Sequence, residues 1–131
     1  MPPSGDHWER WLASVGPGHR RLVAQDADGL HGYAYSTDYR PRPAYRHTRE
    51  VSVYLSPGSV GRGVGRALYD ELLAALRDDG VHVALAAVAL PNEASRALHR
   101  SCGFTPVGVM REVGHKLDRW IDVEWWQRWL R

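Results

Sequence analysis

The stretch from residue 50 to residue 80 restricts the fold of this 131-residue chain more than any other. Residues 50–55 alternate apolar and polar side chains, which predicts a strand with one buried face. A glycine-rich turn follows at residues 61–66, and residues 67–76 then repeat apolar side chains with the period of a helix that stops at Asp79-Gly80. A strand, a glycine turn and an amphipathic helix in this order predict an α/β fold.

The segments on either side predict further strands and one more helix. Trp8, Trp11, Leu12 and Val15 recur at spacings of three and four, which predicts a helix over residues 4–15. The remaining expectations are strands at 20–24 and 30–35 joined by a turn at Asp28-Gly29, a proline-containing loop at 38–47, a strand buried on both faces at 81–90, a helix at 93–102, a strand at 104–111, a loop at 114–119 and a last strand at 120–130. The order predicts one domain over residues 1–131, a mixed α/β layer with the helices as crossovers.

Charge and cysteine content argue against several classes of protein. The formal net charge is +2, from 17 basic and 15 acidic residues without a polybasic run, so we expect no nucleic-acid partner. The single cysteine, Cys102, excludes an internal disulfide, and we expect it to be a small buried apolar residue in a reducing compartment. No apolar run reaches the roughly 18 residues of a membrane span, and no signal peptide is recognisable, so we expect a cytoplasmic protein without membrane contact.

The glycine-rich turn is the first candidate for a functional site. Its residues are Gly61, Arg62, Gly63, Val64, Gly65 and Arg66. Glycines allow a sharp turn that directs several backbone N–H groups toward one point at a helix N-terminus, where phosphate binds well. A turn without function is an equally ordinary explanation of such a short motif. A Lys-Ser/Thr pair and a second βαβ unit are both missing, so neither a nucleoside triphosphate loop nor a dinucleotide fold is predicted.

A second motif follows at residues 92–104, which read Asn-Glu-Ala-Ser-Arg-Ala-Leu-His-Arg-Ser-Cys-Gly-Phe. Together with the glycine turn, it resembles the GNAT N-acetyltransferase superfamily, with its pyrophosphate loop and its N-x-x-[SA]…G-[FY] helix. Over about residues 20–128 the chain is similar to the phosphinothricin acetyltransferase branch, through Arg42-Pro43-Ala44-Tyr45, Thr48-Arg49-Glu50, Ser52-Val53-Tyr54-Leu55, Leu90-Pro91-Asn92, Leu98-His99, Val113-Gly114-His115-Lys116, Trp120, Asp122-Val123 and Gln127. The resemblance implies the acyl-CoA N-acyltransferase fold, with a mixed, mostly antiparallel sheet and crossover helices.

Two features depart from the resembled family. The family's pyrophosphate loop usually opens with Gln or Arg, where this chain has Val60. The family fold also begins with a strand and a helix that would precede residue 4, so we expect an N-terminally shortened version. Either the chain is truncated relative to its relatives, or a second copy covers the exposed sheet edge as a homodimer, since a bare edge strand promotes aggregation.

The resemblance implies transfer of an acetyl group from acetyl-CoA to the primary amine of a small amino-acid-like molecule. Phosphinothricin and methionine sulfoximine or sulfone are the acceptors that it implies. Glu50 corresponds to the branch's general base; the alternative is that it is simply a solvated charged residue at the start of a strand. His99 corresponds to a general acid or a positioning residue, and its alternative is a hydrogen-bonded core histidine.

The resemblance also implies contacts with the cofactor and the acceptor. Val53, Tyr54 and Leu55 would offer backbone groups to the pantetheine arm, and Asn92 and Ser95 would hold its amides. These residues would otherwise be an ordinary core strand and a helix N-cap. Arg42 and Tyr45 are candidates for binding the acceptor's carboxylate, because guanidinium matches that group.

Seven histidines show no ligand spacing, so we expect no metal site. The mechanism that follows is direct transfer in a ternary complex, without a covalent acyl-enzyme. Two other hypotheses remain open: a CoA-binding module without transferase activity, and a structural α/β fragment. Binding of CoA would exclude the structural fragment. Release of free thiol in the presence of amines would distinguish a transferase from a CoA-binding module.

Overall fold

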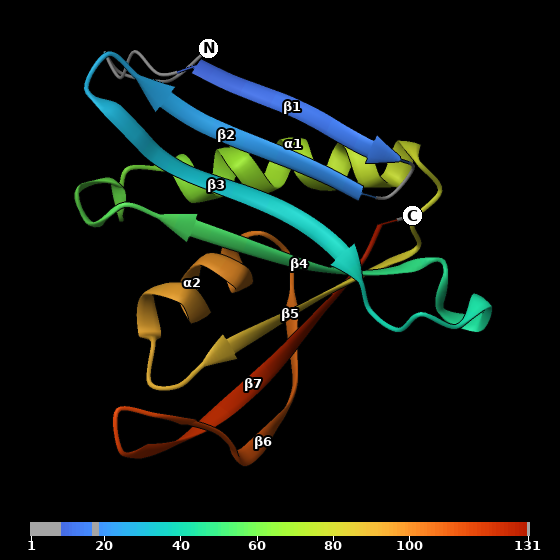
Figure 1. Cartoon of the computed structure of the whole chain (residues 1–131), viewed down its shortest axis with the longest axis vertical. Helices are drawn as coiled ribbons and strands as arrows, with labels where there is room; N and C mark the ends of the chain where they lie inside the picture. Colours follow the sequence, from blue (N-terminus) through green and yellow to red (C-terminus); the bar gives the residue numbers. More distant parts are fainter. Residues whose placement is uncertain (1–8, 17–18, 131) are drawn as a thin grey trace.

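The computed structural model describes residues 9–16 and 19–130. These residues form one seven-stranded sheet in the order β1-β2-β3-β4-β5-β7-β6 (Figure 1). β4 and β5 pair in parallel, and all other neighbouring strands pair antiparallel. The strands are β1 (Glu9–Gly16), β2 (His19–Asp26), β3 (Gly29–Asp38), β4 (Thr48–Leu55), β5 (Val83–Ala89), β6 (Thr105–Lys116) and β7 (Arg119–Trp129).

Two α-helices pack against the sheet and against each other. α1 (Val64–Asp78) connects β4 to β5 and contacts β2, β3 and β4, while α2 (Glu93–Ser101) follows β5 (Figure 1). Two short 3-10 turns, η1 (Pro43–Tyr45) and η2 (Pro57–Ser59), precede β4 and α1. Since α1 crosses from one parallel strand to the next, it is the crossover helix that parallel pairing requires.

One apolar core joins the helices to the sheet. Leu68, Leu72 and Leu76 of α1 are fully buried, as is Leu22 of β2. Trp126 of β7 is the largest fully buried side chain of the described residues and lies opposite Ala86 of β5. The apolar period of α1 therefore determines which helix face meets the sheet.

β4 and β5 separate after a short stretch of pairing. Their register joins only Thr48 to Val83, Arg49 to Ala84 and Glu50 to Leu85, although both strands continue well beyond. In Figure 1 the two strands diverge from this point, and α2 lies beside the opening. Glu50 is thus at the vertex of the separation.

Most predicted elements are confirmed, including the mixed, mostly antiparallel sheet and both main helices. The helix predicted over 4–15 is wrong for residues 9–15, which belong to β1 and pair with β2; residues 4–8 lie outside the described part. The apolar residues of this segment are compatible with both the helical and the strand period, and pairing with β2 favours the strand. The strand at 81–90 is buried on alternate residues rather than on both faces, because Ala87 and Ala89 are exposed.

The last hairpin also differs from the prediction. The loop predicted at 114–119 is only a turn at Leu117-Asp118, because β6 extends to Lys116. Cys102 is buried, as predicted. Within residues 9–16 and 19–130, no helix is long and apolar enough to cross a membrane.

Candidate active site

The glycine turn places the start of α1 in an unusual backbone conformation. Gly61 and Gly63 have φ values of +82° and +81°, which side-chain-bearing residues rarely adopt. Gly63 is the N-cap of α1, and among the described residues no side chain caps this helix. The first-turn N–H groups are therefore left for another acceptor, and the helix dipole favours an anion there.

Gly65 brings three elements close together. A Cβ at this position would lie 3.0 Å from Cδ2 of Leu98 in α2 and 3.2 Å from Cδ1 of Leu55 in β4. Only glycine allows this approach without displacing a neighbour. The turn, the end of β4 and one face of α2 consequently surround a common space.

That space is a pocket of about 690 Å³. It opens where β4 has separated from β5, and the N-terminus of α1 forms one of its ends. Apolar atoms dominate its walls, as is usual for cofactor sites. The lining residues are Val53, Tyr54, Leu55, Val60, Gly61, Gly63, Gly65, Arg66, Asn92, Ala94, Ser95, Ala97, Leu98 and Ser101.

Most of the predicted cofactor residues meet in this pocket. They are Val53, Tyr54, Leu55, Gly61, Gly63, Gly65, Arg66, Asn92 and Ser95. Two others are absent from its walls: Val64 is 1% exposed and packs in the core, and Arg62 is exposed. Asn92 also caps α2, since its Oδ1 accepts a hydrogen bond from the Ser95 N–H at 3.0 Å. The N-cap interpretation of Asn92 is therefore confirmed, and its role toward a cofactor stays a prediction.

The prediction missed the pocket residues Val60, Ala94, Ala97, Leu98 and Ser101. A signal was present, because four of them lie on α2 at positions 94, 97, 98 and 101, which is the spacing of one helix face. Small side chains on that face leave room for a ligand between α2 and β4.

Glu50 lies at the vertex where β4 leaves β5, opposite Thr37 of β3. Burial raises the pKa of its carboxyl above the ordinary value, and the positive charge of Arg40 partly opposes this effect. Glu50 is not among the residues that line the pocket; it lies where β4 and β5 begin to separate. A carboxylate with a raised pKa is suited to accept a proton closer to neutral pH. Arg40 was missed as a neighbour of Glu50, although it stands two residues before Arg42 in the same loop.

His99 is placed in the core and not in the pocket wall. It is 3% exposed, its Nε2 lies 2.9 Å from the Tyr69 hydroxyl, and its Nδ1 lies 2.7 Å from the Ser95 carbonyl oxygen. A carbonyl only accepts, so Nδ1 carries the proton and Nε2 accepts from Tyr69. Burial lowers the pKa of His99, which favours this neutral form. The alternative of a hydrogen-bonded core histidine therefore describes its surroundings, and its role in catalysis stays a prediction.

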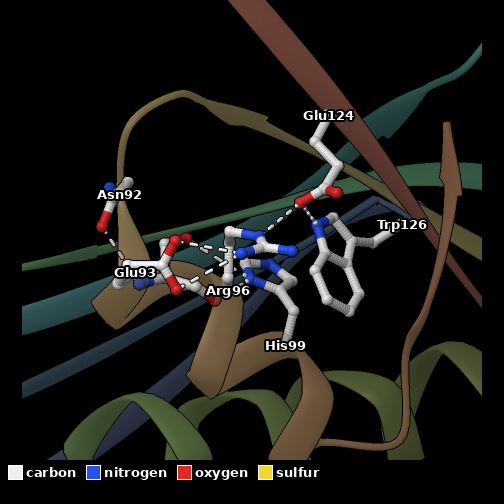
Figure 2. Close-up of polar contacts among 7 residues, drawn as sticks. Asn92, Glu93, Arg96, His99, Glu124 and Trp126 are labelled. Carbon is white, nitrogen blue, oxygen red and sulfur yellow. Dashed lines mark hydrogen bonds and ion pairs between the residues drawn. The ribbon is translucent and has the colours of Figure 1, made fainter. Parts of the chain in front are cut away.

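A polar cluster fastens α2 to β7 beside His99 (Figure 2). Glu124 is 7% exposed, and its Oε1 accepts from Arg96 Nε at 2.8 Å and from Trp126 Nε1 at 3.0 Å. Arg96 also donates to Glu93 through Nη1 at 2.9 Å. Figure 2 shows Arg96 reaching from the helix to the strand. Because α2 carries much of the pocket wall, this cluster fixes the wall's position.

The predicted acceptor residues lie on the loop before β4. Arg42 and Tyr45 are exposed, and the ring of Tyr45 packs edge-on against Tyr39 at a centroid distance of 5.9 Å. Tyr39 in turn contacts Trp125 of β7 at 6.5 Å. The loop is thus anchored on β7, and its Arg40 acts on Glu50. Trp120, one of the residues that carry the resemblance, is 65% exposed, and its ring centroid lies 4.6 Å from that of His115.

The described residues contain no group of three His, Cys, Asp or Glu side chains arranged to hold a metal ion.

Comparisons with known proteins identify what this geometry is similar to. Residues 2–125 match the family model described as "Acetyltransferase (GNAT) domain". A phosphinothricin N-acetyltransferase of Streptomyces coelicolor is 47% identical over 123 residues, covering 90% of this chain and 71% of the relative. An L-methionine sulfoximine/L-methionine sulfone acetyltransferase of Pseudomonas paraeruginosa is 42% identical over 121 residues, covering 91% of this chain and 70% of the relative.

A solved structure agrees with these relatives. The GNAT superfamily phosphinothricin acetyltransferase of Sinorhizobium meliloti, in complex with acetyl-CoA, superposes with a TM-score of 0.80 at 39% identity, covering 86% of this chain and 62% of the other. The chain spans about two thirds of the length of the curated relatives it matches, from 60% to 71%.

Proposed function

The chain belongs to the GNAT acetyltransferase family, and from that premise we propose that it transfers an acetyl group from acetyl-CoA to the primary amine of a small amino-acid-like molecule. The family and its phosphinothricin branch are those that the sequence predicted, and this prediction is confirmed. The activity of this chain, its acceptor and the roles of its residues are proposals.

The observation that carries the proposal is the separation of β4 from β5 after Glu50. Beyond Glu50, β4 no longer pairs with β5 but still pairs with β3, and its residues Val53, Tyr54 and Leu55 line the pocket. Alternate backbone N–H and C=O groups of such a strand point away from its paired neighbour. The pantetheine arm of acetyl-CoA carries amides and would bind there as an added strand does.

The residues present also fit the charged end of the cofactor. The positive-φ glycines and the uncapped start of α1 offer backbone donors to a pyrophosphate. Arg66, in the first turn of the helix, lines the same pocket and would add a positive charge. Arg62 is exposed at the turn and would reach the phosphates from outside the pocket.

Glu50 would accept the proton that the substrate ammonium must lose before its nitrogen can attack the thioester carbonyl. Acetyl-CoA would supply that thioester: the nitrogen bonds to the carbonyl carbon, the carbon–sulfur bond breaks, and CoA leaves as a thiolate. The second proton lost by the attacking nitrogen balances the one that converts this thiolate to free thiol. No covalent acyl-enzyme is needed. His99 would act as a positioning residue, because its Nδ1 holds the Ser95 carbonyl and Ser95 lines the pocket.

The acceptor is proposed to be a small amino acid of the phosphinothricin or methionine sulfoximine type, the compounds in the names of the relatives. Arg42 and Tyr45 remain candidates for its carboxylate. Arg40, whose charge reaches Glu50, is a further candidate from the same loop.

Calorimetric titration with acetyl-CoA, followed by an amine panel with detection of free thiol, tests the proposal. Micromolar binding and thiol release with an amino-acid acceptor would support acetyl transfer. Binding of acetyl-CoA without release of free CoA thiol in the presence of any amine would instead favour a CoA-binding module. Absence of binding would contradict both the transferase and the CoA-binding module.

Three further expectations accompany the proposal: one domain over residues 1–131, a cytoplasmic location, and a homodimer. The homodimer is supported by apolar side chains exposed on the β6–β7 hairpin, among them Val107, Val113 and Trp120. Light scattering of the purified chain tests the oligomeric state.

A further inference from the structure

His31 lies on β3, outside the pocket, and its ring connects two separate segments. Its Nε2 is 2.6 Å from Oδ2 of Asp26, at the end of β2. Its Nδ1 is 2.7 Å from Oγ of Ser59, the last residue of η2. One side chain therefore ties the β2–β3 hairpin to the turn that leads into the glycine-rich segment.

Ser59 is the buried partner in this arrangement. It is 1% exposed, and its hydroxyl also lies 3.0 Å from Oγ of Ser56. The main chain reinforces the contact, because the Ser56 N–H donates to the His31 carbonyl at 2.9 Å. A buried hydroxyl is costly to leave without a hydrogen bond. Both ends of η2 are consequently held by His31, one by its ring and one by its carbonyl.

The fastening continues into the glycine turn. The Arg62 N–H donates to the Ser59 carbonyl at 3.3 Å, and Val60 and Gly61, between them, line the pocket. The hydrogen bond from His31 lowers the pKa of Asp26, and the positive charge of Arg62 contributes to the same effect. The turn is thus joined to the hairpin through Ser59, and the charge of Arg62 acts on Asp26 of the same hairpin.

The composition of the turn makes its order costly. Val60 brings no polar group to it, and Gly61 and Gly63 have open space around their α-carbons and lose much conformational freedom when ordered. A segment that must be ordered at the moment of binding weakens affinity, whereas one already ordered does not.

We propose that His31 is a positioning residue for the cofactor: by fixing Ser59 it keeps the glycine turn in the conformation that receives the pyrophosphate of acetyl-CoA. This inference rests on the proposed function, because it presupposes acetyl-CoA as the ligand. His31 touches neither the pocket nor the reacting atoms, so its effect is on the affinity for the phosphate-bearing part of the cofactor and not on the chemical step.

The test compares two acetyl donors in His31→Ala and wild type. Acetyl-CoA carries the pyrophosphate, whereas S-acetylpantetheine keeps the thioester and the pantetheine arm and lacks it. We expect the Kd of acetyl-CoA, measured by calorimetry, to rise about 5-fold to 30-fold, as for loss of a hydrogen bond to a buried group. The Kd of S-acetylpantetheine, measured by ligand-observed NMR, should stay within about twofold, because its contacts lie along β4.

His19→Ala is the matched control. His19 Nε2 lies 2.9 Å from Asp38 Oδ1, so it forms a similar histidine–aspartate pair, at the opposite ends of β2 and β3 from His31. This variant should bind both donors as the wild type does. Ser59→Ala removes the buried hydroxyl with little change of volume, and it decides the question if His31→Ala does not fold.

The outcomes separate the two proposals. If wild type does not bind acetyl-CoA, the proposed function fails. If wild type binds it and the His31 and Ser59 variants bind equally well, the positioning role is overturned while the proposed function stands. An equal loss for both donors would also overturn the inference, because it would indicate general damage to the cleft.

Discussion

Replacing Gly63 with alanine tests whether the glycine turn depends on a left-handed backbone. Gly63 is the N-cap of α1 with φ at +81°, and nothing lies within 4 Å of an added Cβ. The substitution therefore introduces backbone strain without a steric clash. Left-handed geometry costs a residue with a side chain about 1–2 kcal/mol.

This strain can lower either the free energy of unfolding or the affinity for acetyl-CoA, depending on the conformation of the unbound turn. If the unbound turn keeps its conformation, the free energy of unfolding falls by the full amount, which lowers the Tm by roughly 3–10 °C in a domain of this size. If the unbound turn relaxes to negative φ, its N–H groups turn away and must be restored on binding, so acetyl-CoA binds about 5-fold to 30-fold more weakly. The losses in stability and in binding free energy together should amount to about 1–2 kcal/mol.

Calorimetry with acetyl-CoA and thermal unfolding measure the two quantities on the same samples. Gly58→Ala is the matched control, since Gly58 lies in η2, has no positive φ and has open space for a Cβ. It should match wild type in both assays. Gly63→Ala with unchanged affinity and unchanged Tm would refute the reasoning, because the turn would then accept an ordinary residue without cost.

Three other substitutions test the neighbouring residues. Glu50→Gln should lower kcat by about 10²–10⁴-fold while acetyl-CoA affinity stays within about twofold. Burial raises the pKa of Glu50, so wild-type activity should fall at acidic pH with a midpoint above the ordinary glutamate pKa of about 4.3. This acidic fall should be missing from the pH–rate profile of the variant. Burial lowers the pKa of His99 in the folded protein, so as the pH falls the imidazole is protonated in the unfolded chain first. The free energy of unfolding should therefore decline below about pH 6.5, by up to about 1.4 kcal/mol per pH unit, until the pH reaches the lowered pKa. Urea denaturation of His99→Asn should show a smaller decline than wild type, and an identical decline would contradict this assignment. Glu124→Ala deprives the buried indole N–H of Trp126 of its acceptor and should lower the free energy of unfolding by about 1–3 kcal/mol, whereas Glu124→Gln, which keeps an oxygen there, should lose less in the same assay.

The elements that were predicted correctly carry their signals locally. α1 has an unbroken apolar period and a terminal glycine, and α2 begins at Asn92, which caps it. β1 was predicted as a helix because residues 9–16 are compatible with either period. Its pairing with β2 decides the conformation, and that partner is not visible in the local spacing.

The candidate site also contains parts that were predicted and contacts that were not. Its contiguous parts were predicted: the glycine turn from its own residues, and residues 53–55 from the family resemblance. The contacts that span the chain were not: His31 meets Ser59 28 residues later, and the charge of Arg40 acts on Glu50 across a loop. Such pairs depend on strand register and loop path, and one sequence without tertiary information specifies neither.

The cleft can be traced to the absence of a side chain at Gly65. Leu55 of β4 and Leu98 of α2 both reach this α-carbon, so β4, α1 and α2 meet at one point. With Leu98 at that point, α2 contributes a face of small side chains to the pocket beside the end of β4, on the side where β5 has already separated from β4. Gly65 and Arg66 of the first turn of α1 line the same pocket, and Glu50 stands where β4 and β5 separate. A Cβ at Gly65 would force the side-chain ends of Leu98 and Leu55 to give way by a few tenths of an ångström, and it would therefore disturb the pocket wall beside the helix N-terminus.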